Sequence, residues 1–387
     1  MRYLNFLSRK FINKSIRQEV PYIDFTREYK TIETEIDQAY KQVMERGWYI
    51  LGPEVIKFEK EFANYCRTKY AIGVASGIDA LTLVLDAWGM GPGDEAIVPA
   101  NTYIATAFAA SHLGAKPVFV DIDPNSFNID VKKIESAITE RTRVIIPTHL
   151  YGQMANMEPI LKIAQKYNLK VLEDAAQAHG AKQKGQICGG HGDAVAFSFY
   201  PTKNLGCYGD GGAITTNDPK LYEILLHLRN NGSKTKYYYD YIGYNSRLDE
   251  MQAGFLSVKL KHLDQWNAKR AELAEYYLKE LKGIDDLVLP TTDTNNSHTW
   301  HVFCVRILNG RRESLIDFLK SNSIGYNIHY PLPPHLQNCY KDMDLDTGAF
   351  QFAEKTSEEI LSLPLSPFHR LDEIIRVVSV IKNFFKV

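Results

Sequence analysis

The sequence predicts an α/β protein built on a mainly parallel, seven-stranded sheet, followed by a smaller C-terminal α/β domain. From about residue 54 to 230, short apolar runs alternate with amphipathic segments of helical length. This rhythm is typical of βαβ units with helices on both faces of a sheet. The runs are almost continuously apolar, as expected of strands that are buried on both sides. At 387 residues the chain exceeds one ordinary domain, so a second unit is expected.

The expected strands and helices of the large domain follow in regular order. They are strand 70–75, helix 77–88, strand 95–99, helix 103–112, strand 117–121, helix 131–138, strand 144–148, helix 157–167 and strand 170–174. Two further strands, 194–199 and 212–216, are joined by a loop without room for a crossover helix. One of these two strands should therefore run antiparallel to its neighbour.

The pattern changes after residue 250. A long charged segment with heptad-like apolar positions, about 251–281, predicts one helix that bridges two domains. The small domain should contain strand 300–306 and helices 312–322 and 371–385. The predicted division is a basic extension (1–19), a large α/β domain (20–250), a linking helix (251–284) and a small domain (285–387).

Composition excludes several classes of function. The formal net charge of −1 gives no reason to expect a nucleic-acid partner. No apolar run is long enough to span a membrane. The five cysteines lack any C-x-x-C spacing, which argues against a metal site and favours a reducing compartment, the cytoplasm. The signatures of dinucleotide-binding proteins, serine hydrolases and zinc proteases are absent as well.

The first 18 residues form a separate feature. They carry five basic and no acidic side chains among aromatic and aliphatic ones. Such a segment could act as a targeting or surface-binding helix. We favour a plainer interpretation, a mobile basic extension or a strap across a partner subunit.

Lys203 and Asp174 are the residues that indicate a chemistry. Lys203 lies in the loop after strand 194–199, and Asp174 closes strand 170–174. A pyridoxal phosphate enzyme needs such a pair, because the lysine forms a Schiff base and the carboxylate keeps the pyridine nitrogen protonated. Alone, the lysine could be a solvated surface group and the aspartate a helix cap. The packed, glycine-rich surroundings of Lys203 favour the catalytic interpretation, since a desolvated lysine has a lowered pKa.

Other candidate residues surround this pair in the sequence. Gly77 opens a helix after a strand, where free backbone N–H groups bind phosphate, and Ser198 could add a hydroxyl. Gln177 follows Asp174 by one helical turn and could reach the ring oxygen of the cofactor. Tyr103 is either a core aromatic residue or a ring stacked on the cofactor. His329 and His335, with Tyr330, could line a polar sugar pocket.

Four segments together resemble the DegT/StrS family of sugar aminotransferases. They are residues 76–81, 173–177, 198–212 and 243–253, and the resemblance extends over about 20–387. It implies the aspartate aminotransferase-like fold (fold type I) and pyridoxal 5'-phosphate as cofactor. It also implies a homodimer whose active sites are shared between the subunits.

The resemblance assigns a role to each matching residue. It places Lys203 at the Schiff base, Asp174 at the pyridine nitrogen, Gln177 at the ring oxygen, Gly77, Ile78 and Ser198 at the phosphate, Tyr103 against the ring, and Asn245 at the phosphate of the neighbouring subunit. Two positions depart from the family pattern. Members often carry threonine where this chain has Ile78, so a hydroxyl contact to the phosphate is lost here. Many members also carry histidine where this chain has Tyr200.

The loop around Lys203 narrows the expected substrate. Residues 199–206 and 208–212 resemble the subgroup that aminates C3 of nucleotide-linked 3-keto sugars, above all the dTDP-3-keto-6-deoxyhexose transaminases. Its usual amino donor is L-glutamate, and its products enter deoxyaminosugar biosynthesis for O-antigen, lipopolysaccharide or other glycans. The expected substrate contacts are Tyr200, Lys234 (near the pyrophosphate), His329, Tyr330 and His335.

Three alternatives remain open from the sequence. A C3 transaminase of a UDP-2-acetamido-3-keto uronic acid and a C4 sugar-nucleotide transaminase would share these motifs. A regulatory protein that binds pyridoxal phosphate without turnover belongs to a different class, and it would usually carry a DNA-binding domain. The dehydratase branch of the fold is disfavoured, because it has histidine in place of Lys203.

Overall fold

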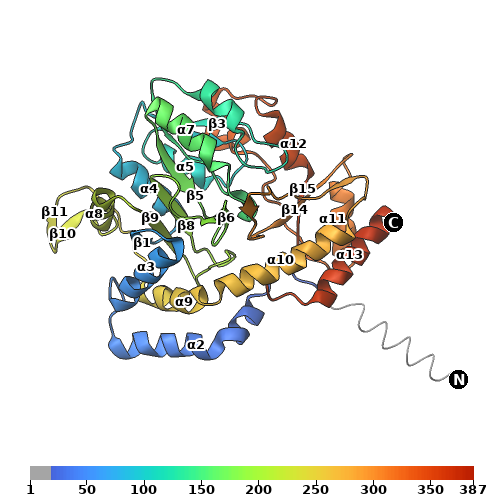
Figure 1. Ribbon diagram of the computed structural model, residues 1–387, viewed down its shortest axis with the longest axis horizontal. Helices are drawn as coiled ribbons and strands as arrows, with labels where there is room; N and C mark the ends of the chain where they lie inside the picture. Colours follow the sequence, from blue (N-terminus) through green and yellow to red (C-terminus); the bar gives the residue numbers. More distant parts are fainter. Residues whose placement is uncertain (1–18) are drawn as a thin grey trace.

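The computed structural model describes residues 19–387 and contains the expected central sheet (Figure 1). The seven strands lie in the order β1-β9-β8-β5-β4-β2-β3. Their bounds are β1 Tyr70–Val74, β2 Glu95–Pro99, β3 Lys116–Val120, β4 Thr142–Ile145, β5 Lys170–Asp174, β8 Ala194–Ser198 and β9 Gly212–Thr216. β9 runs antiparallel to both β1 and β8, and the remaining pairs are parallel. The predicted fold class and the antiparallel strand are therefore confirmed.

Both faces of the sheet are buried, which explains the continuous apolar runs. Successive side chains of a strand point to opposite faces. Ile72 and Val98 accordingly belong to one hydrophobic cluster, whereas Ala71 and Ile97 belong to another. Helices cover both faces in Figure 1. The covering helices include α3 Pro53–Cys66, α4 Gly77–Ala87, α5 Ala105–Ser111, α7 Met157–Tyr167 and α8 Pro219–Leu228.

Some boundaries differ from the expected ones. The helix expected at 103–112 begins only at Ala105, so Tyr103 lies in the preceding loop. The helix expected at 131–138 is α6 Val131–Ile134, which continues as the 3-10 turn η1 Glu135–Ala137. The strand expected at 144–148 is β4, which ends at Ile145.

The prediction of a single long helix at 251–281 is wrong. The chain forms α9 Glu250–Leu260 and α10 Leu263–Glu280, with a break at Lys261 and His262. The physical reason is that the two halves pack on different partners. Phe255 and Val258 of α9 face the long N-terminal helix α2 Phe25–Arg46, whereas Leu273 and Tyr277 of α10 join the core of the small domain.

Two N-terminal helices, α2 and α3, have no counterpart among the expected elements. Asp24 caps α2 by accepting hydrogen bonds from Thr26 N and Arg27 N. The fully buried carboxylate of Glu250 accepts from Gly52 N, Glu54 N and Val55 N at the start of α3, at 2.8–3.0 Å. Figure 1 shows α2 beneath α9 at the lower edge of the molecule.

The smaller α/β unit surrounds a three-stranded antiparallel sheet. Its elements are β12 Leu287–Val288, α11 Arg312–Ser321, α12 Gln351–Glu359, β14 Phe303–Ile307, β15 Ile360–Leu363 and α13 Leu371–Phe385. Val20, near the N-terminus, joins this core and donates its N–H to Ser323 O at 3.0 Å. The remaining short elements are η2 Leu150–Gly152, β6 Lys182–Gln183, β7 Gln186–Ile187, β10 Ser233–Thr235, β11 Tyr238–Tyr239, β13 Asn296–Ser297, η3 Pro334–Leu336 and η4 Asn338–Met343.

Two observations concern the chain as a whole. No helix within residues 19–387 has the length and apolar character needed to cross a membrane. All five cysteines are free thiols, and only Cys339 is exposed. The expected basic extension lies outside the described residues, except for its last residue, Glu19.

Candidate active site

A cavity of about 530 Å³ opens at the carboxyl ends of the parallel strands, where ligands of open α/β sheets bind. Ten residues singled out from the sequence line it. They are Gly77, Ile78, Tyr103, Asp174, Gln177, Ser198, Tyr200, Lys203, His329 and Tyr330. The structure thus brings the two chemically informative residues, Lys203 and Asp174, to one enclosed space.

Asp174 is buried at the end of β5, and its carboxylate is held by neighbours on two sides. Thr106 Oγ1 donates to Asp174 Oδ2 at 2.7 Å, and the backbone N–H of Ala176 donates to Oδ1 at 3.1 Å. Thr102 links the hydroxyl of Thr106 (2.9 Å) to that of Thr148 (3.1 Å). Among residues 19–387, no ion pair involves Asp174, so its charge is available to a cationic group in the cavity.

The amine of Lys203 faces the same cavity from the loop between β8 and β9. Burial lowers the pKa of Lys203 to about 8, and the charge of Asp174 opposes this shift. Burial, with a smaller contribution from the Lys203 charge, lowers the pKa of His179 to about 3 and that of His329 to about 4. The nearby imidazoles are therefore neutral at pH 7, and Asp174 supplies the charge that favours the ammonium.

A pH profile tests this environment directly. In cofactor-free protein, we expect acetic anhydride to acylate Lys203 with a rate that rises with pH and levels off above about 8. The reason is that only the neutral amine is nucleophilic, and its fraction grows as pH passes the pKa. Peptide mass spectrometry measures the rate. The exposed Lys182 serves as the internal reference for the labelling rate.

The start of α4 provides an anion site on the other side of the cavity. Ser76 caps the helix by accepting from Asp79 N at 3.2 Å. A Cβ atom on Gly77 would lie 2.6 Å from Ser198 Cβ, so only glycine allows this close approach of α4 to β8. The free N–H groups and the positive end of an eleven-residue helix are suited to a phosphate.

The small domain contributes one wall of the cavity. Gln177 Nε2 donates to the hydroxyl of Tyr330 at 3.0 Å, and Gln177 Oε1 accepts from Tyr151 N at 2.7 Å. Tyr330 also lies beside Tyr103, with ring centroids 5.6 Å apart. Both Tyr103 and Tyr200 are more than half exposed, so their rings are free to cover a ligand in the cavity.

Three of the expected site residues do not line this cavity. Asn245 is exposed beside the hairpin β10–β11, and Lys234 on β10 is 4.0 Å from Glu223. His335 is placed differently from the expected sugar pocket. Its ring is buried at the start of η3 against Phe119 and Phe350 and lies 3.2 Å from Glu354 Oε1. The contacts of His335 are thus those of a core residue.

Sequence reasoning missed several polar residues that line the cavity or hold its carboxylate. They include Thr102, Thr106, Thr148, Asp210 and His301. A usable signal existed for the threonines. Thr102 and Thr106 are four residues apart after β2, and Thr148 follows β4, so all three lie at the same edge of the sheet as Asp174.

Replacing Thr106 with valine should lower kcat about tenfold, because the Asp174 carboxylate loses a hydrogen bond of the kind worth ~1.5 kcal/mol or more. Valine keeps the shape of the side chain. The matched control is Thr82→Val in α4, where the buried hydroxyl has no hydrogen-bond partner within the described residues. Steady-state rates that fall equally in both variants would contradict a specific role for Thr106.

A fully buried group of His149, Glu173 and Cys188 lies behind Asp174, with ligand atoms within 4.8 Å of one another. His149 Nδ1 accepts from Ala155 N at 3.1 Å, so a ring proton lies on Nε2, 2.8 Å from Glu173 Oε2. Glu173 Oε1 also accepts from Gly192 N at 2.7 Å. Both ring nitrogens are in use, which identifies a hydrogen-bonded pair in the core.

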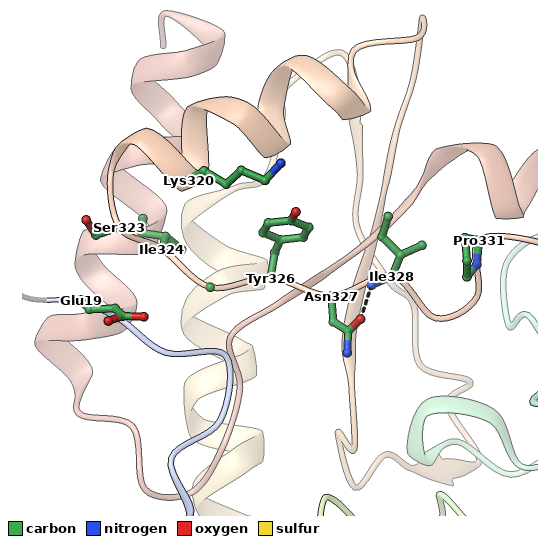
Figure 2. A pocket seen from close by; sticks show the side chains of 9 residues that line it. Glu19, Lys320, Ser323, Ile324, Tyr326, Asn327, Ile328 and Pro331 are labelled. Atoms are coloured by element: carbon green, nitrogen blue, oxygen red, sulfur yellow. Dashed lines mark hydrogen bonds between the residues drawn. The ribbon is translucent and has the colours of Figure 1, made fainter.

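A second hollow of about 620 Å³ lies on the small domain (Figure 2). Glu19, Lys320, Tyr326 and Asn327 are among the residues that line it. Lys320 is paired with Asp317 at 3.3 Å, outside the hollow. This hollow is lined by none of the residues that the sequence singled out for a functional site.

The first cavity fits pyridoxal phosphate. The phosphate matches the start of α4 with the close contact at Gly77, a protonated ring nitrogen matches the unpaired carboxylate of Asp174, and the aldehyde matches the amine of Lys203. Each of the three ends of the cofactor thus has a partner of suitable chemistry on a separate element.

Comparison with known proteins finds relatives that match most of the chain. The profile of the DegT/DnrJ/EryC1/StrS aminotransferase family matches residues 30–382. A relative from Aneurinibacillus thermoaerophilus, dTDP-3-amino-3,6-dideoxy-alpha-D-galactopyranose transaminase, is 50% identical over 94% of this chain and 99% of its own length. A Streptomyces venezuelae relative, dTDP-3-amino-3,4,6-trideoxy-alpha-D-glucose transaminase, is 45% identical over 94% of this chain and 96% of its own.

A solved structure shares the fold. The crystal structure of S. venezuelae DesV in complex with a ketimine intermediate superposes with a TM-score of 0.93 at 44% identity. The match covers 95% of this chain and 99% of that one. It confirms the fold class that the resemblance implied.

Proposed function

Because the chain belongs to the DegT/DnrJ/EryC1/StrS aminotransferase family, we propose that it transfers an amino group to a nucleotide-linked keto sugar, with pyridoxal 5'-phosphate as cofactor. The substrate that we propose is a dTDP-3-keto-6-deoxyhexose, and the product is the dTDP-3-amino-3,6-dideoxyhexose. L-glutamate is the proposed amino donor.

One observation carries the proposal, namely that Lys203 and Asp174 share one cavity although they come from different strand ends. Bound pyridoxal phosphate supplies an electron sink for the carbon that gains or loses the amino group. Asp174 would hold a positive charge at the ring nitrogen, and the start of α4 with Ser198 would bind the phosphate. The Nζ atom of Lys203 accepts a proton and returns it, because its lowered pKa keeps a useful fraction neutral near pH 7.

The other residues around the cavity orient the reactants. Gln177 is fixed by Tyr151 and Tyr330, so its side-chain amide is held toward the ring oxygen that we assign to it. Tyr103 covers the ring face. His329 and Tyr200, on the small-domain wall and the lysine loop, are the proposed contacts of the sugar.

We propose a homodimer in which Asn245 and Lys234 complete the neighbouring active site. Supporting this, both residues lie outside the cavity of their own subunit, on a surface rich in exposed apolar side chains. These include Trp48, Tyr49, Ile50, Tyr237, Tyr238, Tyr239, Tyr241 and Ile242, the last of which is 97% exposed. Exposed patches of this kind mark protein interfaces.

The proposed location is the cytoplasm, where free thiols persist, and the proposed fate of the product is glycan biosynthesis, such as that of O-antigen. The UDP-linked and C4 alternatives are not favoured, since the two relatives described above are named as transaminases of dTDP-linked 3-amino sugars. The regulatory alternative is not favoured either, since the family profile that matches residues 30–382 is that of aminotransferases and the two relatives described above are named as transaminases.

A panel of keto sugar nucleotides tests the proposal. The purified protein, loaded with pyridoxal phosphate, is mixed with glutamate that carries isotopically labelled nitrogen. A dTDP-3-keto sugar, a UDP-3-keto uronic acid and a 4-keto sugar nucleotide are made in one pot with the precursor enzymes, because they are labile. We expect mass spectrometry to find labelled amine with the dTDP-3-keto sugar. Labelled product from none of the three would contradict the proposed function.

A further inference from the structure

A buried lysine of helix α9 donates a hydrogen bond to the loop that carries Lys203. Lys259 is 1% exposed, and its Nζ donates to the carbonyl oxygen of Gly206 at 2.7 Å. Gly206 lies three residues after Lys203 in a turn that folds back on itself. A Cβ atom on Gly206 would lie 2.6 Å from Pro201 O, and Lys203 N donates to Tyr200 O at 2.8 Å. A shift of Gly206 therefore moves Lys203 as well.

The charge of Lys259 has two further partners. Glu28 Oε1, from the first turn of α2, lies 2.5 Å from Nζ. The ring of Tyr208, which belongs to the lysine loop, lies 3.6 Å from Nζ to its centroid, a cation–π contact. The loop thus meets Lys259 at two points, one carbonyl and one aromatic face, while Glu28 supplies the opposite charge.

Stability alone does not explain a cation at this position. Removing two charges from water is costly, and replacing a buried ion pair by apolar groups of similar volume is often neutral or stabilising. Burial lowers the pKa of Lys259, although Glu28 opposes the shift. A methionine at position 259 would fill much of the same space, but it would leave the Gly206 carbonyl without its donor.

Other contacts fix the same loop on either side of Gly206. Asn204 Nδ2 donates to Asn267 Oδ1 on α10 at 2.8 Å and to Thr299 O at 2.9 Å. Tyr208 N donates to Gln252 Oε1 at 2.8 Å. Lys259 holds the segment between these anchors. We propose that Lys259 is a positioning residue that sets how deeply the Lys203 amine lies in the cavity, an inference that rests on the function proposed above.

The test compares Lys203 in three cofactor-free proteins. They are the wild type, the double variant Glu28→Gln with Lys259→Met, and the control Lys261→Met. The double variant removes both charges together, so it leaves no unpaired buried ion and no net change in the local charge. The control makes the same substitution at an exposed lysine just after α9. Acetic anhydride labels the amines, and mass spectrometry gives the rate at Lys203 against pH.

In the double variant we expect the midpoint of the Lys203 profile to rise, because a looser loop admits water to the amine. The labelling rate at neutral pH should fall about threefold or more, and kcat of the reloaded enzyme about tenfold. Lys261→Met should match the wild type. An unchanged Lys203 midpoint in a folded double variant, whatever its melting temperature, would overturn the positioning role.

The two proposals fail in different ways. If wild-type protein does not hold pyridoxal phosphate covalently at Lys203, the proposed function fails. If the wild type holds it and shows a midpoint near 8, but the double variant behaves identically, only the role of Lys259 fails. If the double variant does not fold, Lys259→Gln, which keeps a polar side chain too short to reach Gly206 O, is subject to the same criterion.

Discussion

Lys203→Ala should abolish transamination and the covalent attachment of pyridoxal phosphate together. In the proposed mechanism the amine is both the nucleophile that holds the cofactor and the base that moves the proton, so two functions would be lost at one position. We expect kcat to fall by at least about 10⁴-fold. Turnover is measured with the keto sugar panel, and attachment is measured by borohydride reduction followed by the intact mass.

The matched control for this variant is Lys182→Ala on β6, which removes an exposed lysine away from the cavity. It should keep both turnover and attachment. A Lys203→Ala protein that is folded and still carries reducible cofactor would show that another amine holds it. That outcome would contradict the assignment of Lys203 as the residue that holds the cofactor.

Asp174→Asn should separate these two properties. Asparagine keeps the size of the side chain but loses the charge that we propose for the ring nitrogen. We expect covalent attachment at Lys203 to persist, whereas kcat falls about 10³-fold, a loss typical of a missing electrostatic partner in a dry site. The intact mass after reduction and single-turnover rates with glutamate provide the two measurements.

Asp218→Asn is the control for the aspartate. Asp218 caps α8 by accepting from Lys220 N at 2.8 Å, and asparagine caps helices equally well. Its rates should equal those of the wild type. Asp174→Asn with near-normal turnover would mean that the carboxylate is only structural, and the electronic role assigned to it would be withdrawn.

Much of the large domain could be predicted because its signals are local. Strands such as β5 and β8 are short apolar runs between polar turns. Successive side chains of a strand point to the two faces of the sheet, and both faces are buried, so the apolar run itself indicates the strand. The break between α9 and α10 could not be predicted in this way. Charged and apolar residues continue through Lys261 and His262, and only the change of packing partner, from α2 to the small domain, separates the two helices.

In the candidate site, too, residues with a local sequence signal could be predicted, and contacts between distant parts of the chain could not. Lys203 and Asp174 could be identified because each directly follows a strand and belongs to a recognisable segment. The hydrogen bond from Thr106 to Asp174 and the contact between Lys259 and Gly206 join residues more than fifty positions apart. Their partners are fixed by the folded chain alone. His335 shows the opposite case, since its place in a proline-rich loop gave no sign that its ring is buried.

The position of β1 at the edge of the central sheet has a consequence for biosynthesis. Within residues 19–387, β1 pairs only with β9, and Val74 lies opposite Gly212. On the ribosome, β1 leaves the exit tunnel long before β9 is translated, so its backbone remains without a sheet partner while most of the domain emerges. The pairing of β1 with β9 therefore forms late in folding, and it joins residues far apart in the sequence, which makes it a slow folding step. During that interval the nascent chain exposes an apolar strand that chaperones can bind.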